Sequence, residues 1–307
     1  MSKLLNGRAI AGTLGNATLS LLLLAAVSAC GGGDSTPPVS TVTSSSVAAT
    51  RYGSTAIISL SGTNLDSSGL SVTSSGCKNM ARSTTGALVS SATNAYYTCT
   101  VSGAFSGNIS IKSNGNVIAN PTFTVPAPQV TLTVAYGAGL SGQIVLTLMG
   151  DKVPTTVDNF LGYVNKSPSF YKGTIFHRLA KLTSDPSHYF VLQAGGYGAT
   201  VNGQLPSHKT TDAPIAVETA GGNNVQWSVA MANNGPGTVT SEFFVNAVDN
   251  TATLQNGYSV FGNITSGIDV AQAIEAAPVN CTTNGLIGTI DCLPQPDVTI
   301  TDAVQTR

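Results

Sequence analysis

Two fragments decide the fold of the C-terminal part of the chain: Phe176-His177-Arg178, and Phe190-Val191-Leu192-Gln193-Ala194-Gly195-Gly196. Three more follow in order, namely Met231-Ala232-Asn233, Ser241-Glu242-Phe243-Phe244 and Val260-Phe261-Gly262. The segment that contains them, from about residue 144 to 275, is rich in short β-like runs bounded by turn residues. One Arg, one Gln, one Asn and several aromatic side chains spread along such a segment can line a single groove.

The periodicity of apolar residues predicts the elements around these fragments. Residues 130–134 and 144–148 alternate between apolar and polar, which predicts two strands of one hairpin or meander. Pro154 opens a helix at a position where its missing N–H costs little. That helix has an apolar face with helical spacing, made of Val157, Phe160, Leu161 and Val164. A second helix is predicted from the same spacing of Val270, Ala273, Ile274 and Ala277.

Fragment by fragment and in the same order, the sequence resembles the cyclophilin family of peptidyl-prolyl isomerases over about residues 130 to 277. The resemblance implies a mainly β fold, a closed β-barrel capped by two helices, and an enzyme that isomerises X–Pro bonds. Rotation of such a bond breaks amide resonance against a barrier of ~18–20 kcal/mol. No covalent bond forms, so we expect neither a cofactor nor a metal. The chemistry needs an apolar slot for the proline ring and a donor near the prolyl nitrogen, which gains a lone pair as the bond twists.

The resemblance also implies the site. Arg178 is permanently charged and carries a fork of donors, which suits the prolyl nitrogen; with Gln193 and Phe244 it forms the expected catalytic set. The expected substrate-binding residues are Phe190, Val191, Ala232, Asn233, Glu242, Leu254 and Tyr258. Strand alternation places Phe243 and Phe244 on opposite faces, so that Phe243 belongs to the core. His177 and Phe261 are expected to be scaffold.

Ordinary structural roles remain open for several of these residues. Arg178 could be a surface arginine in an ion pair, and Gln193 and Asn233 could be ordinary strand or turn residues.

Two departures from the family bear on activity. Eleven residues, 179–189, separate Arg178 from Phe190, where the family has a shorter connection. Glu242 replaces the usual Gln, and its carboxylate could pair with Arg178, holding it in place or blunting its donors.

The N-terminus predicts export. Lys3 and Arg8 precede an apolar run that is densest at residues 21–26, and no acidic residue occurs before Asp34. Such a segment is typical of a secretory signal peptide, here residues 1–29. Residues 27–30 resemble a bacterial lipobox, in which Cys30 becomes the lipidated first residue; an ordinary signal peptide with a chance cysteine is the alternative. We expect a lipid anchor to the cell envelope on the periplasmic side. The Gly after Cys30 favours the outer membrane by resemblance to lipoprotein sorting signals.

Composition divides the rest of the chain. Residues 30–46 are rich in Gly, Ser, Thr and Pro, which predicts a flexible tether. Residues 47–126 carry short β-like runs at the spacing of a small immunoglobulin-like β-sandwich, a spacer or binding module. Prolines 126 and 128 mark the boundary to the isomerase domain, residues 127–307.

Five cysteines leave four when Cys30 is set aside. They fall into two local pairs, Cys77 with Cys99 and Cys281 with Cys292, which an exported chain can keep oxidised. Other connectivities and free thiols stay open. Only 9% of residues are charged and the net charge is −1, so we expect no nucleic-acid partner.

Three functions remain on the sequence alone. The first is an isomerase of X–Pro bonds in exported or envelope proteins, assisting their folding, with proline-containing polypeptides as partners. The second is a cyclophilin-fold module that binds proline-containing peptides without catalysis. The third is a surface lipoprotein with a structural or adhesive role.

Overall fold

The computed structural model describes residues 36–49, 51–102, 106–137, 139, 141–254, 257–284 and 289–307. The chain from Thr36 to Arg307 forms one compact unit. The expected signal peptide, Cys30 and the first residues of the expected tether lie outside the described ranges. No helix in the described part of the chain is both long enough and apolar enough to cross a membrane.

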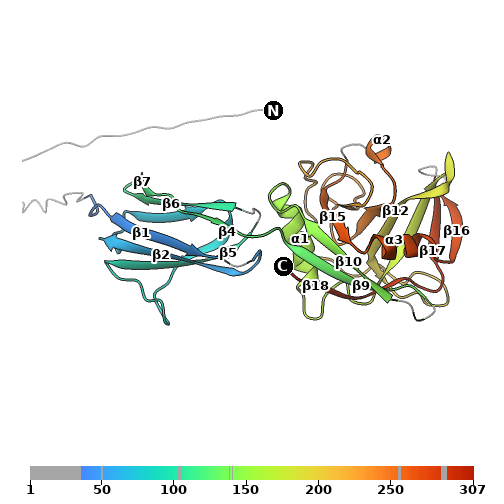
Figure 1. The fold of residues 1–307 in the computed structure, drawn as a ribbon, viewed down its shortest axis with the longest axis horizontal. Helices are drawn as coiled ribbons and strands as arrows, with labels where there is room; N and C mark the ends of the chain where they lie inside the picture. Colours follow the sequence, from blue (N-terminus) through green and yellow to red (C-terminus); the bar gives the residue numbers. More distant parts are fainter. Residues whose placement is uncertain are drawn as a thin grey trace, which may run out of the picture. The chain divides into compact units, whose positions relative to one another are not determined.

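Two antiparallel four-stranded sheets make up the N-terminal part, drawn in blue to green in Figure 1. One sheet has the order β1-β2-β5-β4, and the other has the order β3-β6-β7 with β8 paired to β6. The strands are β1 Thr41–Ala48, β2 Thr55–Thr63, β3 Leu70–Ser74, β4 Cys77–Arg82, β5 Asn94–Val101, β6 Ser106–Ser113, β7 Asn116–Ala119 and β8 Thr122–Thr124. Alternate residues of β2 and β5 are buried, and Ile58, Val101 and Ile109 share one apolar core. Both sheets contribute to that core, as expected of a small sandwich.

Strand β1 occupies residues that the sequence assigns to the tether. Its Ser- and Thr-rich stretch pairs with β2 along the whole strand, from Thr41 opposite Thr63 to Ala48 opposite Ile57. Its two valines, Val42 and Val47, are five positions apart and do not alternate, so hydrophobic periodicity does not mark the strand. Backbone pairing with β2 places the strand in the sheet, and Val42 and Val47 pack against the sandwich core.

Eight strands close into a barrel in the C-terminal part. Their order is β12-β14-β13-β15-β10-β9-β18-β11, and the pairing of β11 with β12 closes the ring. The strands are β9 Gln129–Ala135, β10 Ser141–Leu148, β11 Thr174–Leu182, β12 Asp185–Gly198, β13 Ser228–Met231, β14 Phe243–Asn246, β15 Val260–Ser266 and β18 Thr299–Gln305. The predicted meander of β9 and β10 is confirmed, as is the closed barrel.

Two helices cap the barrel and pack into its core (Figure 1). In α1, Pro154–Val164, all four residues of the predicted apolar face are buried. The Phe160 ring lies 5.2 Å from Tyr171 and 4.8 Å from Phe261, centroid to centroid. In α3, Ile268–Glu275, Val270 and Ile274 are buried, whereas Ala277 of the predicted face follows the end of the helix. A single further turn, α2, spans Thr251–Leu254.

The segment that lengthens the chain between Arg178 and Phe190 forms the outer end of the β11–β12 hairpin. There β11 gains a second neighbour, because β17, Thr289–Pro294, pairs with residues 179–182. Strand β16, Val279–Asn284, pairs with β17 and completes a hairpin outside the barrel ring. The disulfides Cys77–Cys99 and Cys281–Cys292 are present, as predicted.

Candidate functional site

The three expected catalytic residues form a row across neighbouring strands. Arg178 on β11 lies opposite Gln193 on β12, and Gln193 lies opposite Phe244 on β14. Residues directly opposite each other in antiparallel strands share a face, with side chains close enough to interact. The structure therefore brings Arg178, Gln193 and Phe244 together, although 66 positions separate the first from the last.

One side of this row is a hollow of about 470 Å³, called the apolar hollow below after the aromatic and aliphatic side chains in its wall; polar side chains such as Thr253 and Thr289 line it too. Its expected members all line it: Phe190, Val191, Phe244, Leu254 and Tyr258. The Tyr258 ring stands perpendicular to Phe244, with 5.3 Å between centroids. On the opposite face of β14, Phe243 is fully buried in the barrel core, which confirms the predicted division between the two phenylalanines.

A β-bulge brings two consecutive residues of β12 to the same hollow. Val191 pairs with Ala180 and Tyr189 pairs with Lys181, so Phe190 is the extra residue between them. A bulge re-aims side chains at the edge of a barrel. Phe190 and Val191 are therefore both packed in the cluster that contains Phe244, instead of alternating between faces.

The other side of the row is a polar hollow of about 820 Å³. Glu242, His177 and Tyr197 lie on its walls, and the β16–β17 hairpin contributes Asp291. Five residues line both hollows: Arg178, Gln193, Ala232, Asn233 and Asn234. The two hollows thus form one groove, apolar on one side of Arg178 and polar on the other.

Arg178 is held at two of its three nitrogens. Nε donates to Asp291 Oδ1 at 2.8 Å, and Nη1 donates to Gln193 Oε1 at 3.0 Å. Nη2 is buried and has no hydrogen-bond partner among the described residues. Arg178 does form an ion pair, which is the alternative to a catalytic role, but it does so within the groove, and its Nη2 nitrogen has no partner among the described residues.

Glu242 pairs with neighbours other than Arg178. Its carboxylate accepts from Gln193 Nε2 at 2.5 Å and contacts His208 Nε2 at 2.6 Å and His177 Nε2 at 3.3 Å. Burial by itself raises the pKa of Glu242, but the hydrogen bond and charge of His177, with the hydrogen bonds of Gln193 and His208, lower it to about 2. Glu242 is therefore an anion that fixes the Gln193 amide, and it reaches Arg178 through that amide.

The carboxylate beside Arg178 is Asp291, which the sequence analysis misses. No local motif marks it, because 113 positions separate the two residues and only the register of β17 on β11 brings them together. His177 is buried and packs against Tyr197, as expected of scaffold.

Ala232 and Asn233 line the groove as expected, but part of their hydrogen-bonding capacity is used within the chain. The Ala232 N–H donates to the Glu242 carbonyl at 2.9 Å. The Asn233 side chain donates to the Gly257 carbonyl at 2.9 Å and accepts from the Gly235 N–H at 3.2 Å. These contacts brace the wall of the groove, and the Ala232 N–H is already used within the chain and does not donate to a peptide.

Comparison with known proteins gives a family match at residues 131–304, to the family described as cyclophilin type peptidyl-prolyl cis-trans isomerase/CLD. A peptidyl-prolyl cis-trans isomerase of Streptomyces antibioticus is 41% identical over 144 residues, 44% of this chain and 78% of that protein. Peptidyl-prolyl cis-trans isomerase B of Escherichia coli K12 is 34% identical over 168 residues, 52% of this chain and 91% of that protein. A solved structure of a cyclophilin type isomerase from Cryptosporidium parvum matches with a TM-score of 0.41 and 21% identity, over 59% of this chain and 98% of that one. The family match spans the barrel and leaves the N-terminal sandwich outside it.

Proposed function

The chain belongs to the cyclophilin type peptidyl-prolyl cis-trans isomerase family and is a peptidyl-prolyl isomerase. From this premise, we propose that it assists the folding of exported or envelope proteins by isomerising their X–Pro bonds. The cis and trans forms of such a bond differ by only ~0.5–1 kcal/mol. The enzyme therefore has to lower a barrier without favouring either end state.

The observation that carries the catalytic assignment is the Nη2 nitrogen of Arg178, which has no hydrogen-bond partner among the described residues. Nε and Nη1 are occupied by Asp291 and Gln193, which fixes the plane of the guanidinium. Nη2 is left without a hydrogen-bond partner within the described part of the chain. We propose that Nη2 donates a hydrogen bond to the lone pair that forms on the prolyl nitrogen as the bond twists. A preorganised donor stabilises charge that develops in the transition state.

The apolar hollow takes the proline ring in this proposal. Phe190, Val191 and Phe244 present carbon surface beside Arg178, and Leu254 and Tyr258 close the same hollow. A ring held there excludes water from the twisting amide, which strengthens the interaction with the guanidinium. The polar hollow on the other side of Arg178 then receives residues of the polypeptide on the other side of the bond.

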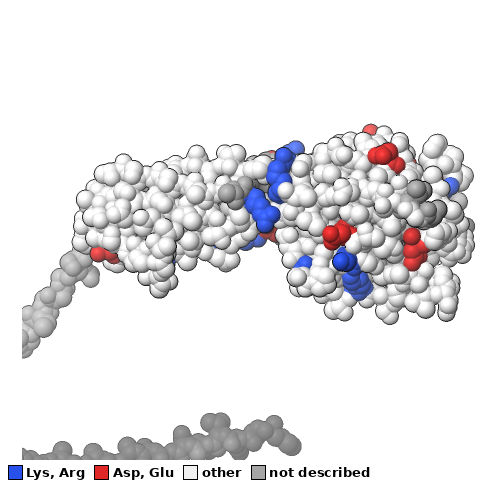
Figure 2. All heavy atoms as spheres, turned by 60° about the horizontal axis from the view of Figure 1, so that its bottom comes forward, with Lys and Arg blue, Asp and Glu red and all other residues white. Residues whose placement is uncertain are grey.

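Substrate selection in this proposal depends on shape and hydrogen bonding more than on net charge. Figure 2 shows one face of the molecule, on which the charged side chains of the described residues stand in small groups among uncharged ones. Only 9% of the chain is charged. A surface of this kind gives little long-range attraction to polypeptides of one charge.

We further propose that Cys30 is lipidated and anchors the enzyme on the periplasmic side of the outer membrane. The disulfides Cys77–Cys99 and Cys281–Cys292 support export, because such bonds persist in oxidising compartments. The signal-peptide pattern of residues 1–29 supports it from the sequence.

Replacing Arg178 tests the catalytic assignment. Arg178→Ala should lower kcat/KM on an X–Pro peptide by about 100-fold or more, the usual cost of removing a preorganised donor. Peptide binding, measured by calorimetry, should change much less, because the interaction is made in the transition state. The exposed Arg51→Ala is the matched control and should retain wild-type rates.

Two results would contradict the assignment. An Arg178→Ala variant that isomerises the peptide at the wild-type rate would remove Arg178 from the mechanism. A wild-type chain that binds the peptide but leaves its isomerisation at the uncatalysed rate would favour a binding module.

A further inference from the structure

We propose that Asp291 positions Arg178 for catalysis and that the disulfide-closed β16–β17 hairpin holds Asp291 in place. The inference rests on the proposed role of Arg178. It adds a second part to the active site, contributed by a hairpin outside the barrel ring, and makes activity depend on the Cys281–Cys292 bond.

The first step is the geometry of the guanidinium. Asp291 Oδ1 holds Nε from β17 at 2.8 Å, and Gln193 Oε1 holds Nη1 from β12 at 3.0 Å. Because the guanidinium is planar and rigid, two contacts from different strands fix the direction of its remaining donor, Nη2. The side chains of Arg178 and Asp291 are each only 22% exposed, so their charge-assisted hydrogen bond is partly shielded from water.

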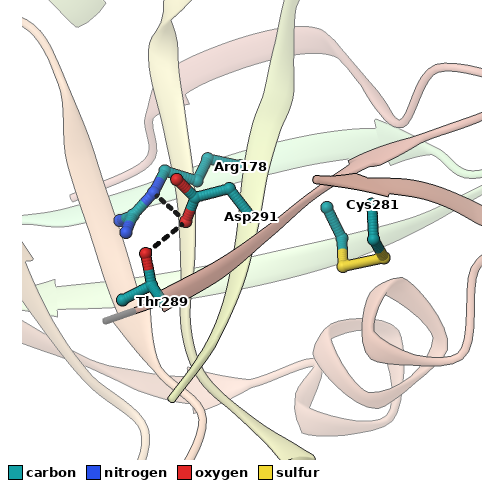
Figure 3. The surroundings of a disulfide bond; sticks show 5 residues. Arg178, Cys281, Thr289 and Asp291 are labelled. Atoms are coloured by element: carbon teal, nitrogen blue, oxygen red, sulfur yellow. Dashed lines mark hydrogen bonds and ion pairs between the residues drawn. A yellow bond between two sulfur atoms is a disulfide. The ribbon is translucent and has the colours of Figure 1, made fainter. Parts of the chain in front are cut away.

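The second step is what holds Asp291. Thr289, two residues earlier on the same strand, donates its hydroxyl to Asp291 Oδ1 at 3.1 Å. Strand pairing places Asp291 opposite Ala180, two residues from Arg178 and hence diagonal to it. Figure 3 shows Thr289 and Arg178 both linked to Asp291, with the disulfide on the neighbouring part of the hairpin.

The third step is the disulfide. Cys292 follows Asp291 directly and lies opposite Cys281 across the hairpin. Cys292 is 1% exposed and belongs to the barrel core, where it pairs in register with Leu179. Strand β16 has β17 as its one strand neighbour in the described sheet, so the covalent bond ties an edge strand to the strand that carries Asp291.

The lengthened β11–β12 hairpin completes the arrangement. The residues of β11 that pair with β17 are 179–182, which begin the segment that separates Arg178 from Phe190. The extension lengthens β11, so that β17 pairs with it as far as Leu182. The insert and the disulfide-closed hairpin thus form one structural unit behind the guanidinium.

The test uses the full purified chain in its oxidised form and an X–Pro peptide. Asp291→Ala should lower kcat about tenfold, as expected for loss of a hydrogen bond between charged groups. KM should stay within about twofold, because Arg178 acts in the transition state. Asp291→Glu should recover part of the rate, and circular dichroism should show both variants folded.

A double-mutant cycle separates positioning from a merely structural role. In an Arg178→Ala background, Asp291→Ala should cause no further loss of the residual rate. An equal tenfold loss in that background, or a wild-type kcat for Asp291→Ala alone, would overturn the inference. If Arg178→Ala is itself fully active, the proposed function of Arg178 fails, and this result is distinguishable from the other two.

Reduction tests the disulfide. Cys77→Ser with Cys99→Ser removes the sandwich disulfide and should leave kcat within about twofold of wild type. A thiol reductant applied to that variant should then lower kcat towards the Asp291→Ala value, and reoxidation should restore it. The same variant that also carries Asp291→Ala should not respond to reductant. A response in the presence of Asp291→Ala, or none in its absence, would overturn the role of the disulfide.

Discussion

At the scale of single residues, Glu242 in the groove departs clearly from the ordinary chemistry of a carboxyl group. Burial opposes its charge, yet His177, Gln193 and His208 all contact the carboxylate and lower its pKa to about 2. Its role in the groove is indirect, since it orients the Gln193 amide, whose oxygen accepts from Arg178. A partly buried anion of this kind couples the stability of the barrel to pH.

Glu242→Gln should flatten the acid side of the stability curve. The pKa of Glu242 is lowered on folding from 4.5 to about 2, so the stabilisation is fully present above pH 4.5 and is lost as the pH falls through the folded value. The shift corresponds to a free energy on the order of 3 kcal/mol. Between pH 5 and pH 2, the wild-type free energy of unfolding should therefore fall further than that of the variant by about this amount, measured by urea unfolding.

Glu275 offers a control of opposite sign. Burial raises the pKa of Glu275, partly offset by the charge of His188, so the protonated form is favoured on folding. Relative to Glu275→Gln, the wild type should lose stability as the pH rises from about 4.5 through the raised pKa of Glu275. Parallel curves for wild type and Glu242→Gln would contradict the assignment of the acid limb to Glu242.

Sequence reasoning identifies Arg178, Gln193 and Phe244 because each lies in a fragment with a recognisable local pattern. It does not identify Asp291, whose neighbours Ile290 and Cys292 carry no motif. The position of Asp291 is decided by which strand lies beside β11 and in which register. That information belongs to the tertiary structure, and no local pattern contains it.

At the scale of elements, strand β14 shows how one local rule separates core from site. Phe243 is fully buried among Phe160, Tyr171 and Phe176, whereas Phe244 packs against Tyr258 in the groove. Alternation predicts this division, and the strand confirms it. Alternation does not hold at Phe190 on β12, because a β-bulge interrupts the pairing of β12 with β11 there.

Truncating Phe243 and truncating Phe244 should therefore have different effects on stability and on activity. Phe243→Ala removes a core ring and should lower the free energy of unfolding by about 3–5 kcal/mol, with kcat/KM per folded molecule close to wild type. Phe244→Ala should destabilise less and lower kcat/KM more, because the expected proline slot loses its aromatic wall. Chemical unfolding and the peptide assay on the same preparations check both. A larger loss of kcat/KM in Phe243→Ala would contradict the division.

Elements are predictable where apolar residues set a period. Helix α1 and strands β9 and β10 follow their patterns closely. Strand β1 and the β16–β17 hairpin do not, because polar residues interrupt their few apolar residues without a regular period. These elements are held by backbone pairing and, in the hairpin, by a disulfide.

At the scale of the whole molecule, closure of the barrel joins distant parts of the sequence. Strand β18, near the C-terminal end of the sequence, lies between β9 and β11 and pairs with both. Its Ile300 and Ala303 are buried in the core that β9 begins. Periodicity predicts strands but not their neighbours, so the closed barrel follows from the family resemblance and from the structure, not from pattern alone.

The proposed anchor makes a prediction about the whole chain in its cell. Cys30→Ser should release the enzyme from membranes, because it removes the proposed attachment site of the lipid, while the X–Pro isomerase activity of the soluble protein should equal that of wild type. Mass spectrometry of the mature N-terminus and membrane fractionation measure the two effects. The matched control is Cys77→Ser with Cys99→Ser, which changes cysteines of a disulfide and should leave the protein lipidated and sedimenting with membranes. A wild-type N-terminus without lipid, or a Cys30→Ser variant that still sediments, would refute the anchor and leave the isomerase assignment intact.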